Sequence, residues 1–240
     1  YEGRSLQRQV YVANRVKTMN ESIYYNVDKI HSAISENVQI SFEYTRWGMK
    51  GKLELAEGRS ATNIGFHIGA TNDNAEEICR LITEGDAETG ITPDDIAGVK
   101  VFMGSSTGNM LVDDNNTLSR LFAISSKPVL VHCEDEAIIR ANLAKATETY
   151  GEDIPFAEHE NIRSRSACIK SSIVALEMAI KHGTRLVLCH ISTKESVDII
   201  RKAKAEGVNV TCETGPHYLV MDDSFLQEEG RFKMNPPLRS

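Results

Sequence analysis

Five short apolar runs alternate with longer stretches of helical periodicity, and this alternation restricts the possible folds more than any other feature. The runs cover 64–70, 99–103, 129–131, 186–189 and 208–211, and helices are predicted at 75–83, 117–124, 135–149, 167–182 and 194–206. Gly183 and Gly207 follow the last two of these helices and are predicted to end them. Short apolar strands that alternate with amphipathic helices indicate βα units, and therefore an α/β fold with a parallel sheet.

The first 50 residues have a different pattern. They carry more basic than acidic side chains, whereas the remainder of the chain is acidic. Helical spacing predicts a helix over 21–36, and alternation of apolar and polar residues predicts a half-buried, antiparallel strand over 38–44. The glycines and lysines of 48–52 interrupt both patterns, so we expect a short α+β segment at 1–50 and an α/β domain at 51–240.

Composition excludes several classes of protein. The mean hydropathy is −0.30, and no apolar stretch approaches the ~18 residues that a membrane helix needs. The formal net charge of −7 argues against nucleic-acid binding over the whole surface. The five cysteines lack zinc-finger spacing, and Cys133, Cys189 and Cys212 lie in or beside apolar runs. This pattern predicts buried free thiols in a reducing compartment, and hence a cytoplasmic protein.

Three residues that can take part in metal chemistry lie in or at the ends of successive predicted strands. Lys100 lies inside GVKVFMG, His132 ends PVLVH and His190 follows RLVLC. Neutral histidines bind zinc directly, and the carboxyl ends of barrel strands are where active sites form. A lysine can bind a cation only after CO2 converts it to an anionic carbamate. The alternatives are structural histidines and a salt-bridged lysine. Glu134 is either a residue that orients a ligand or an acid at a helix N-terminus.

Three further segments carry candidate binding groups. The small polar loop 104–109 is expected to lie near a substrate. His217 either faces the pocket or stabilises its own loop. Asn235 offers one amide with both a donor and an acceptor, which suits the edge of a cyclic imide or ureide, although the residues by themselves favour an Asn-Pro turn. The other histidines are expected to be surface or packing residues: His31, His67, His159 and His182.

Residues 52–240 resemble the middle of a dihydroorotase, in the metal-dependent amidohydrolase superfamily. The stretches that carry the resemblance are NIGFHIGATNDN, GVKVFMGSSTGNMLV, VLVHCEDEAIIR, CHISTKE, VTCETGPHYL and KMNPPLR. Hydantoinases and allantoinases share the strand-end pattern, especially around Cys212–Tyr218, whereas GSSTGNM and KMNPPLR favour dihydroorotase.

This resemblance implies a partial (β/α)8 TIM barrel with two zinc ions. Lys100 would be the carboxylated, bridging and catalytic lysine, and His132 and His190 would be ligands of one zinc. Asn235 would contact the substrate ring, and His217 is a second candidate for substrate binding. The implied reaction interconverts N-carbamoyl-L-aspartate and L-dihydroorotate in pyrimidine biosynthesis, so the expected partner is a small-molecule substrate.

The sequence also departs from this family's pattern. The family has a His-x-His pair on its first barrel strand, and no His-x-His occurs in these 240 residues. The family's catalytic aspartate on the eighth strand also has no counterpart here. We therefore expect negligible dihydroorotase activity from this polypeptide alone. Five strands would leave open sheet edges, which favour pairing with another chain, for example in a homo-oligomer.

Residues 1–50 resemble instead part of a WYL-type transcriptional regulator, through YYNVDKIHSAISENVQISFEY. The Trp-Tyr-Leu signature itself is not present in this segment. Two truncated families in one chain suggest a chimera. A fragment of a ligand-responsive regulator is accordingly an alternative function for the chain, besides a hydantoinase-like or allantoinase-like amidohydrolase.

Overall fold

The computed structural model describes residues 45–59, 62, 64–104, 109–124, 126–227 and 230–240. The chain divides into two units, 1–48 and 49–240, and almost all described residues belong to the second. The expected helix over 21–36, the expected strand over 38–44 and the regulator-like segment lie outside the described residues. The assignment of 1–50 and 51–240 as separate domains therefore stays a prediction.

The second unit contains a five-stranded parallel sheet. Its strands are β1 (Phe66–Gly69), β2 (Ile96–Phe102), β3 (Val129–His132), β4 (Leu186–Leu188) and β5 (Val210–Cys212). They lie side by side in sequence order, β1-β2-β3-β4-β5, and every neighbouring pair is parallel. Sequential order with no reversal is the arrangement of strands in a barrel, not in a doubly wound sheet.

Helices follow each strand except the last much as the sequence predicts. The long predicted ones are α4 (Ala75–Thr83), α5 (Asn115–Ala123), α6 (Glu136–Tyr150), α8 (Arg165–His182) and α9 (Lys194–Ala205). The helix α3 (Thr45–Ala56) was not predicted and corrects the expected interruption at 48–52, because isolated glycines are tolerated within a helix. Short helical turns complete the unit: η1 (Pro93–Asp95), η2 (Phe156–Glu158), α7 (His159–Ile162), α10 (His217–Val220) and η3 (Asp223–Gln227). Gly183 ends α8 in the left-handed conformation with φ 67°, as expected. Among the described residues, no helix is long and apolar enough to cross a membrane.

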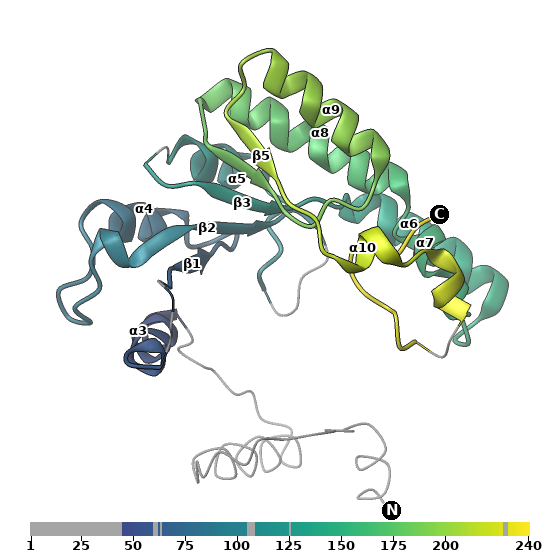
Figure 1. The fold of residues 1–240 in the computed structure, drawn as a ribbon, viewed down its shortest axis with the longest axis horizontal. Coiled ribbons are helices and arrows are strands. Elements are labelled where there is room, and N and C mark those ends of the chain that lie inside the picture. Colours follow the sequence, from purple (N-terminus) through teal and green to yellow (C-terminus); the bar gives the residue numbers. More distant parts are fainter. Residues whose placement is uncertain (1–44, 60–61, 63, 105–108, 125, 228–229) are drawn as a thin grey trace, which may run out of the picture. The chain divides into compact units, whose positions relative to one another are not determined.

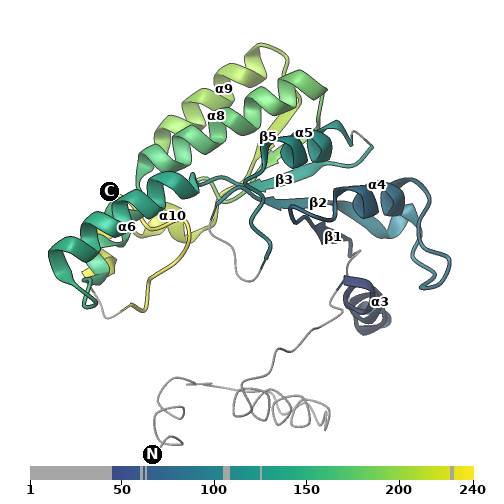
Figure 2. The same cartoon turned by 180° about the vertical axis from the view of Figure 1, so that it is seen from behind.

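The helices α4, α5, α8 and α9 cover one face of the sheet (Figures 1 and 2). Strand side chains that point to this face are fully or almost fully buried: Val99, Val101, Val129, Val131, Leu186, Leu188 and Val210. The alternate residues of the central strands, including Leu130 and Val187, are only half-buried. In a closed barrel these residues fill the interior, so the described strands form an arc whose inner face is partly exposed. Pairing of its edges with another chain stays a prediction.

Gly104 lets the segment after β2 cross closely over the end of β3. A Cβ atom at this position would overlap the backbone carbonyl of Glu134. Gly104→Ala is expected to lower the free energy of unfolding by about 1–3 kcal/mol, because backbone has to move to relieve the overlap. Urea denaturation measures this change. Gly51→Ala is the matched control, since an added Cβ there meets nothing within 4 Å. Equal stability of both variants would contradict the close approach.

Candidate active site

The parallel register brings the predicted chemical residues to one edge of the sheet. Phe102 on β2 pairs with His132 on β3, and Lys100 lies two residues before Phe102 on the same strand face. Val131 pairs with Leu188 on β4, and His190 follows two residues later. Lys100, His132 and His190 therefore come from three neighbouring strands at or near their carboxyl ends.

His132 and His190 are in direct contact. The Nδ1 atom of His132 and the Nε2 atom of His190 lie 3.1 Å apart. The two rings meet edge to face, with centroids 4.8 Å apart and planes inclined at 68°. His132 is almost fully buried. One ring nitrogen from each strand end thus points toward a common position.

The backbone of His190 is strained at this point. Its φ of 40° is the only positive value at a non-glycine residue in the part of the chain that the structure describes. Such conformations persist only where the surroundings enforce them, and they concentrate at functional sites. The Nδ1 atom of His190 is buried and has no hydrogen-bond partner among the described residues. A buried ring nitrogen without a partner is unusual in a histidine that serves packing alone.

Glu134 contacts His132 and does not cap the helix that follows it. Its side chain is fully buried, and Oε2 accepts a hydrogen bond of 2.8 Å from Nε2 of His132. The guanidinium of Arg163 donates to both carboxylate oxygens, with Nε 3.1 Å from Oε1 and Nη2 on Oε2. Asp135 caps α6 instead, because its Oδ1 accepts from the backbone N–H of Ile138 at 2.9 Å.

Glu134 is held in the ionised form. Burial by itself raises the pKa of its carboxyl, but the hydrogen bonds from His132 and Arg163, together with the positive charge of Arg163, lower that pKa below its usual value. A carboxylate only accepts hydrogen bonds, so Nε2 of His132 carries a proton, and in the neutral ring Nδ1 is then the nitrogen with the free lone pair. This is the arrangement in which a carboxylate fixes the tautomer of a metal-binding histidine.

The two histidines fit a metal ion. Two nitrogen ligands of a tetrahedral zinc, at ~2.0–2.1 Å from the ion, lie ~3.3 Å from each other, which is close to the observed 3.1 Å. Burial, followed by the charges of His132 and Lys100, lowers the pKa of His190 to about 4, and the neutral ring is the form that binds metals. In the described residues, no group of three His, Cys, Asp or Glu side chains is arranged to hold a metal.

Lys100 lies beside this pair of histidines. Its ammonium group is 5.0 Å from the centre of the Phe102 ring, and its charge contributes to the lowered pKa values of His67 and His190. Burial raises the pKa of Cys189, while the neighbouring Lys100 partly offsets this rise. None of the ion pairs found between described residues includes Lys100. The salt-bridged lysine that the sequence left open therefore finds no support in this structure.

Asn235 and His217 lie on two segments that contact each other. Tyr218 donates a hydrogen bond of 2.6 Å from its hydroxyl to the carbonyl of Pro236, next to Asn235. The His217 ring packs on Tyr218, with centroids 4.1 Å apart. The charge of Glu134 contributes to the raised pKa of Tyr218, so this hydroxyl lies near the His132–Glu134 pair. Among the described residues, no hydrogen bond or ring contact joins Asn235 or His217 to His132 or His190, and their roles in substrate binding stay predictions.

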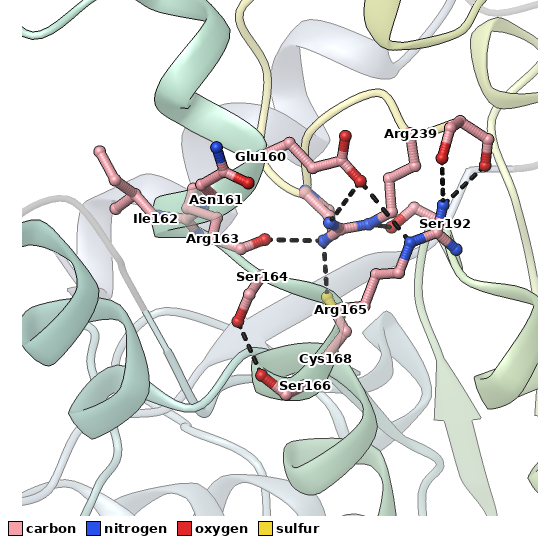
Figure 3. A network of polar contacts seen from close by, with 12 residues as sticks. Glu160, Asn161, Ile162, Arg163, Ser164, Arg165, Ser166, Cys168, Ser192 and Arg239 are labelled. Atoms are coloured by element: carbon pink, nitrogen blue, oxygen red, sulfur yellow. Dashed lines mark hydrogen bonds and ion pairs between the residues drawn. The ribbon is translucent and has the colours of Figure 1, made fainter. Parts of the chain in front are cut away.

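A buried arginine network that the sequence did not predict lies beside the site (Figure 3). Arg239 donates from Nη2 to the carbonyl of Arg163 at 2.8 Å and to the Cys168 sulfur at 3.2 Å. Its Nε donates to the Ser192 hydroxyl at 3.2 Å, and its Nη1 lies 3.7 Å from the Glu160 carboxylate. The network links the C-terminal segment to Arg163, and through Arg163 to Glu134.

The structure corrects the expectation for Cys212 and narrows the expectation for His159. Cys212 is exposed, whereas Cys133, Cys168 and Cys189 are buried. Cys212 lies on β5, which is an edge of the described sheet, and so its apolar neighbours in sequence do not bury it. His159 is a buried residue, which agrees with the packing alternative, and it also contacts Asn235, with Nε2 3.1 Å from Oδ1.

The chain is similar in sequence to known dihydroorotases over part of its length. No protein-family model matches the chain. A dihydroorotase of Latilactobacillus sakei is 38% identical over 116 residues, which are 47% of this chain and 25% of that protein. A dihydroorotase of Listeria welshimeri is 33% identical over 147 residues, which are 60% of this chain and 33% of that protein. The chain thus spans a quarter to a third of the length of these relatives.

Solved structures resemble the fold over most of the chain. The D-hydantoinase of Bacillus sp. AR9 superposes with a TM-score of 0.68 at 25% identity, over 84% of this chain and 43% of that one. The L-hydantoinase of Arthrobacter aurescens gives a TM-score of 0.69 at 26% identity, over 82% and 42%. The parallel arc is therefore part of a TIM barrel of the amidohydrolase type, as the sequence predicts. In sequence and in fold, the chain is similar to parts of cyclic amidohydrolases.

Proposed function

We propose that this chain is the metal-binding part of a zinc-dependent dihydroorotase, which interconverts N-carbamoyl-L-aspartate and L-dihydroorotate in pyrimidine biosynthesis. The observation that carries the proposal is the convergence of His132 and His190, beside Lys100, at the carboxyl ends of adjacent barrel strands. Proteins named dihydroorotase at 33–38% identity support the same assignment. A small-molecule substrate and a cytoplasmic location belong to this proposal.

The residues present would hold the metal as follows. His132 would bind through Nδ1 and His190 through Nε2, and Lys100 would bind as its carbamate. Bound zinc supplies Lewis acidity, which polarises an amide carbonyl and lowers the pKa of water. Glu134 and Arg163 keep the His132 ring in the tautomer whose Nδ1 is free. Asn235 and His217 would bind the polar groups of the substrate.

A hydantoinase is the second candidate, and the structural neighbours favour it. Their chains are D- and L-hydantoinases at 25–26% identity. Against it stand the segments GSSTGNM and KMNPPLR, which are typical of dihydroorotases, and the dihydroorotase relatives of higher identity. The regulator alternative concerns residues 1–50, which lie almost wholly outside the described part of the chain.

Ligand binding separates the two amidohydrolase candidates. Isothermal titration of the zinc-loaded 240-residue chain is expected to show tighter binding of L-dihydroorotate than of hydantoin, because the larger ligand offers a carboxylate as well as the ring amides. Asn235→Ala is expected to weaken L-dihydroorotate binding by about 3- to 10-fold, the effect of one hydrogen bond. His217→Ala tests the second predicted contact in the same way.

His182→Ala is the control, since His182 lies at the far end of α8 and contacts Ser119. Hydantoin binding as tightly as L-dihydroorotate would overturn the dihydroorotase assignment. So would a complete lack of L-dihydroorotate binding by zinc-loaded protein.

A further inference from the structure

The segment that carries Asn235 is fixed by contacts with three other parts of the fold. Tyr218 donates to the carbonyl of Pro236 at 2.6 Å, and His159 contacts the carbonyl of Met234 at 2.9 Å. Arg239 anchors the other end through the carbonyl of Arg163. Four consecutive residues are buried as a result: Pro236, Pro237, Leu238 and Arg239. Asn235, by contrast, is exposed, so this rigid segment presents its side chain outward.

The contacts of His159 determine the direction of the Asn235 amide. The carbonyl of Met234 can only accept a hydrogen bond, and therefore Nε2 of His159 carries a proton. The same Nε2 lies 3.1 Å from the side chain of Asn235. A nitrogen that donates requires an acceptor there, so the amide oxygen Oδ1 faces His159 and the Nδ2 group faces away.

His159 itself is well suited to this task. Its side chain is 8% exposed, and it lies at the start of α7, in a different part of the sequence from Asn235. Burial, as the largest effect, lowers the pKa of the ring, so the neutral form with a single N–H is the one present near pH 7. A neutral ring with its proton on Nε2 leaves one orientation for the amide.

We propose that His159 is a positioning residue, which turns the Asn235 amide so that Nδ2 is offered to the substrate as a hydrogen-bond donor. The ligand atom recognised by Asn235 is then an oxygen acceptor, either a ring carbonyl or a carboxylate, and not a ring N–H. This inference rests on the proposed function only in that Asn235 contacts the substrate. The sequence left open whether the Asn235 amide acts as a donor or as an acceptor toward the substrate, and the contact with His159 assigns it as a donor.

Nitrogen NMR of the 15N-labelled, zinc-loaded chain tests the orientation without any ligand. The ring nitrogen shifts of His159 are expected to identify the Nε2–H tautomer at neutral pH. The Nδ1–H tautomer would overturn the proposal, because Nε2 would then accept a hydrogen bond and Nδ2 of Asn235 would have to face it. This result decides the inference even if L-dihydroorotate does not bind, which would contradict the proposed function alone.

Binding by variants tests the consequence for the ligand. His159→Phe is expected to weaken L-dihydroorotate binding by about 3- to 10-fold, because the amide loses its fixed orientation, with zinc content unchanged. His159→Gln, whose amide N–H group can replace the ring Nε2–H, is expected to restore binding to within about 2-fold of the original chain.

His182→Phe is the matched control for loss of a histidine ring and is expected to bind normally, since His182 contacts Ser119. A His159→Phe variant that folds, retains zinc and binds L-dihydroorotate normally would overturn the positioning role. Equal losses in the Phe and Gln variants would overturn it as well.

Discussion

Replacing Arg163 with alanine is expected to lower the free energy of unfolding by about 3–5 kcal/mol. The reason is that Glu134 is fully buried and Arg163 is 6% exposed, so the variant leaves a carboxylate in the interior without its cation. Arg163 also supplies two of the hydrogen bonds to that carboxylate. Urea denaturation of the metal-free chain, followed by circular dichroism, measures the change.

Two further variants make this test specific. Arg140→Ala removes an arginine whose ion pair with Glu136 is on the surface, and it is expected to cost less than about 1 kcal/mol. Combining Arg163→Ala with Glu134→Gln is expected to cost less than the sum of the single changes, because the two side chains interact directly. A loss below about 1 kcal/mol for Arg163→Ala would show that Arg163 does not hold the Glu134 charge.

Replacing His190 with alanine is expected to weaken zinc binding more strongly than any change outside the site. Loss of a residue that only orients a metal ligand reduces affinity by about 10- to 100-fold, and loss of a direct ligand is expected to exceed this. The Nε2 atom of His190 is one of the two ring nitrogens that converge. Equilibrium dialysis with zinc, followed by metal analysis, gives the affinity of each variant.

Lys100 variants show whether a carbamate takes part. Lys100→Arg keeps the positive charge but has no amine that CO2 can carboxylate, so it is expected to lose zinc as Lys100→Ala does. His182→Ala is expected to bind zinc like the original chain, since it lies apart from the strand ends. Unchanged zinc affinity in the Lys100 variants would show that this lysine is not a zinc ligand. Unchanged zinc affinity in His190→Ala would show the same for the histidine.

The sheet and the long helices that follow its strands could be predicted because their signals are local. Alternating burial places Val99 and Val101 under the helices, and the apolar run that contains them is visible in the sequence. The same reasoning found Lys100, His132 and His190, since a polar residue at the end of a buried strand stands out from its neighbours. Parallel strands in sequence order then bring such residues together without any further information.

The support around the site could not be predicted, because its contacts join distant and irregular segments. Arg163 reaches Glu134 across 29 residues, and Arg239 reaches the Arg163 carbonyl across 76. Neither arginine belongs to a periodic pattern, and a basic residue between helices is usually a surface residue. The contact of His159 with Asn235 could not be predicted for the same reason, since it depends on the fold and not on spacing.

We propose a zinc site formed by His132, His190 and carboxylated Lys100 at the carboxyl ends of β2, β3 and β4. Diffraction at the zinc absorption edge, from crystals of the 240-residue chain grown with zinc and bicarbonate, tests it most directly. An anomalous peak is expected next to Nδ1 of His132 and Nε2 of His190, with added density on the Lys100 nitrogen. A peak elsewhere in the chain, or no peak between two hydrogen-bonded histidine rings, would contradict the claim.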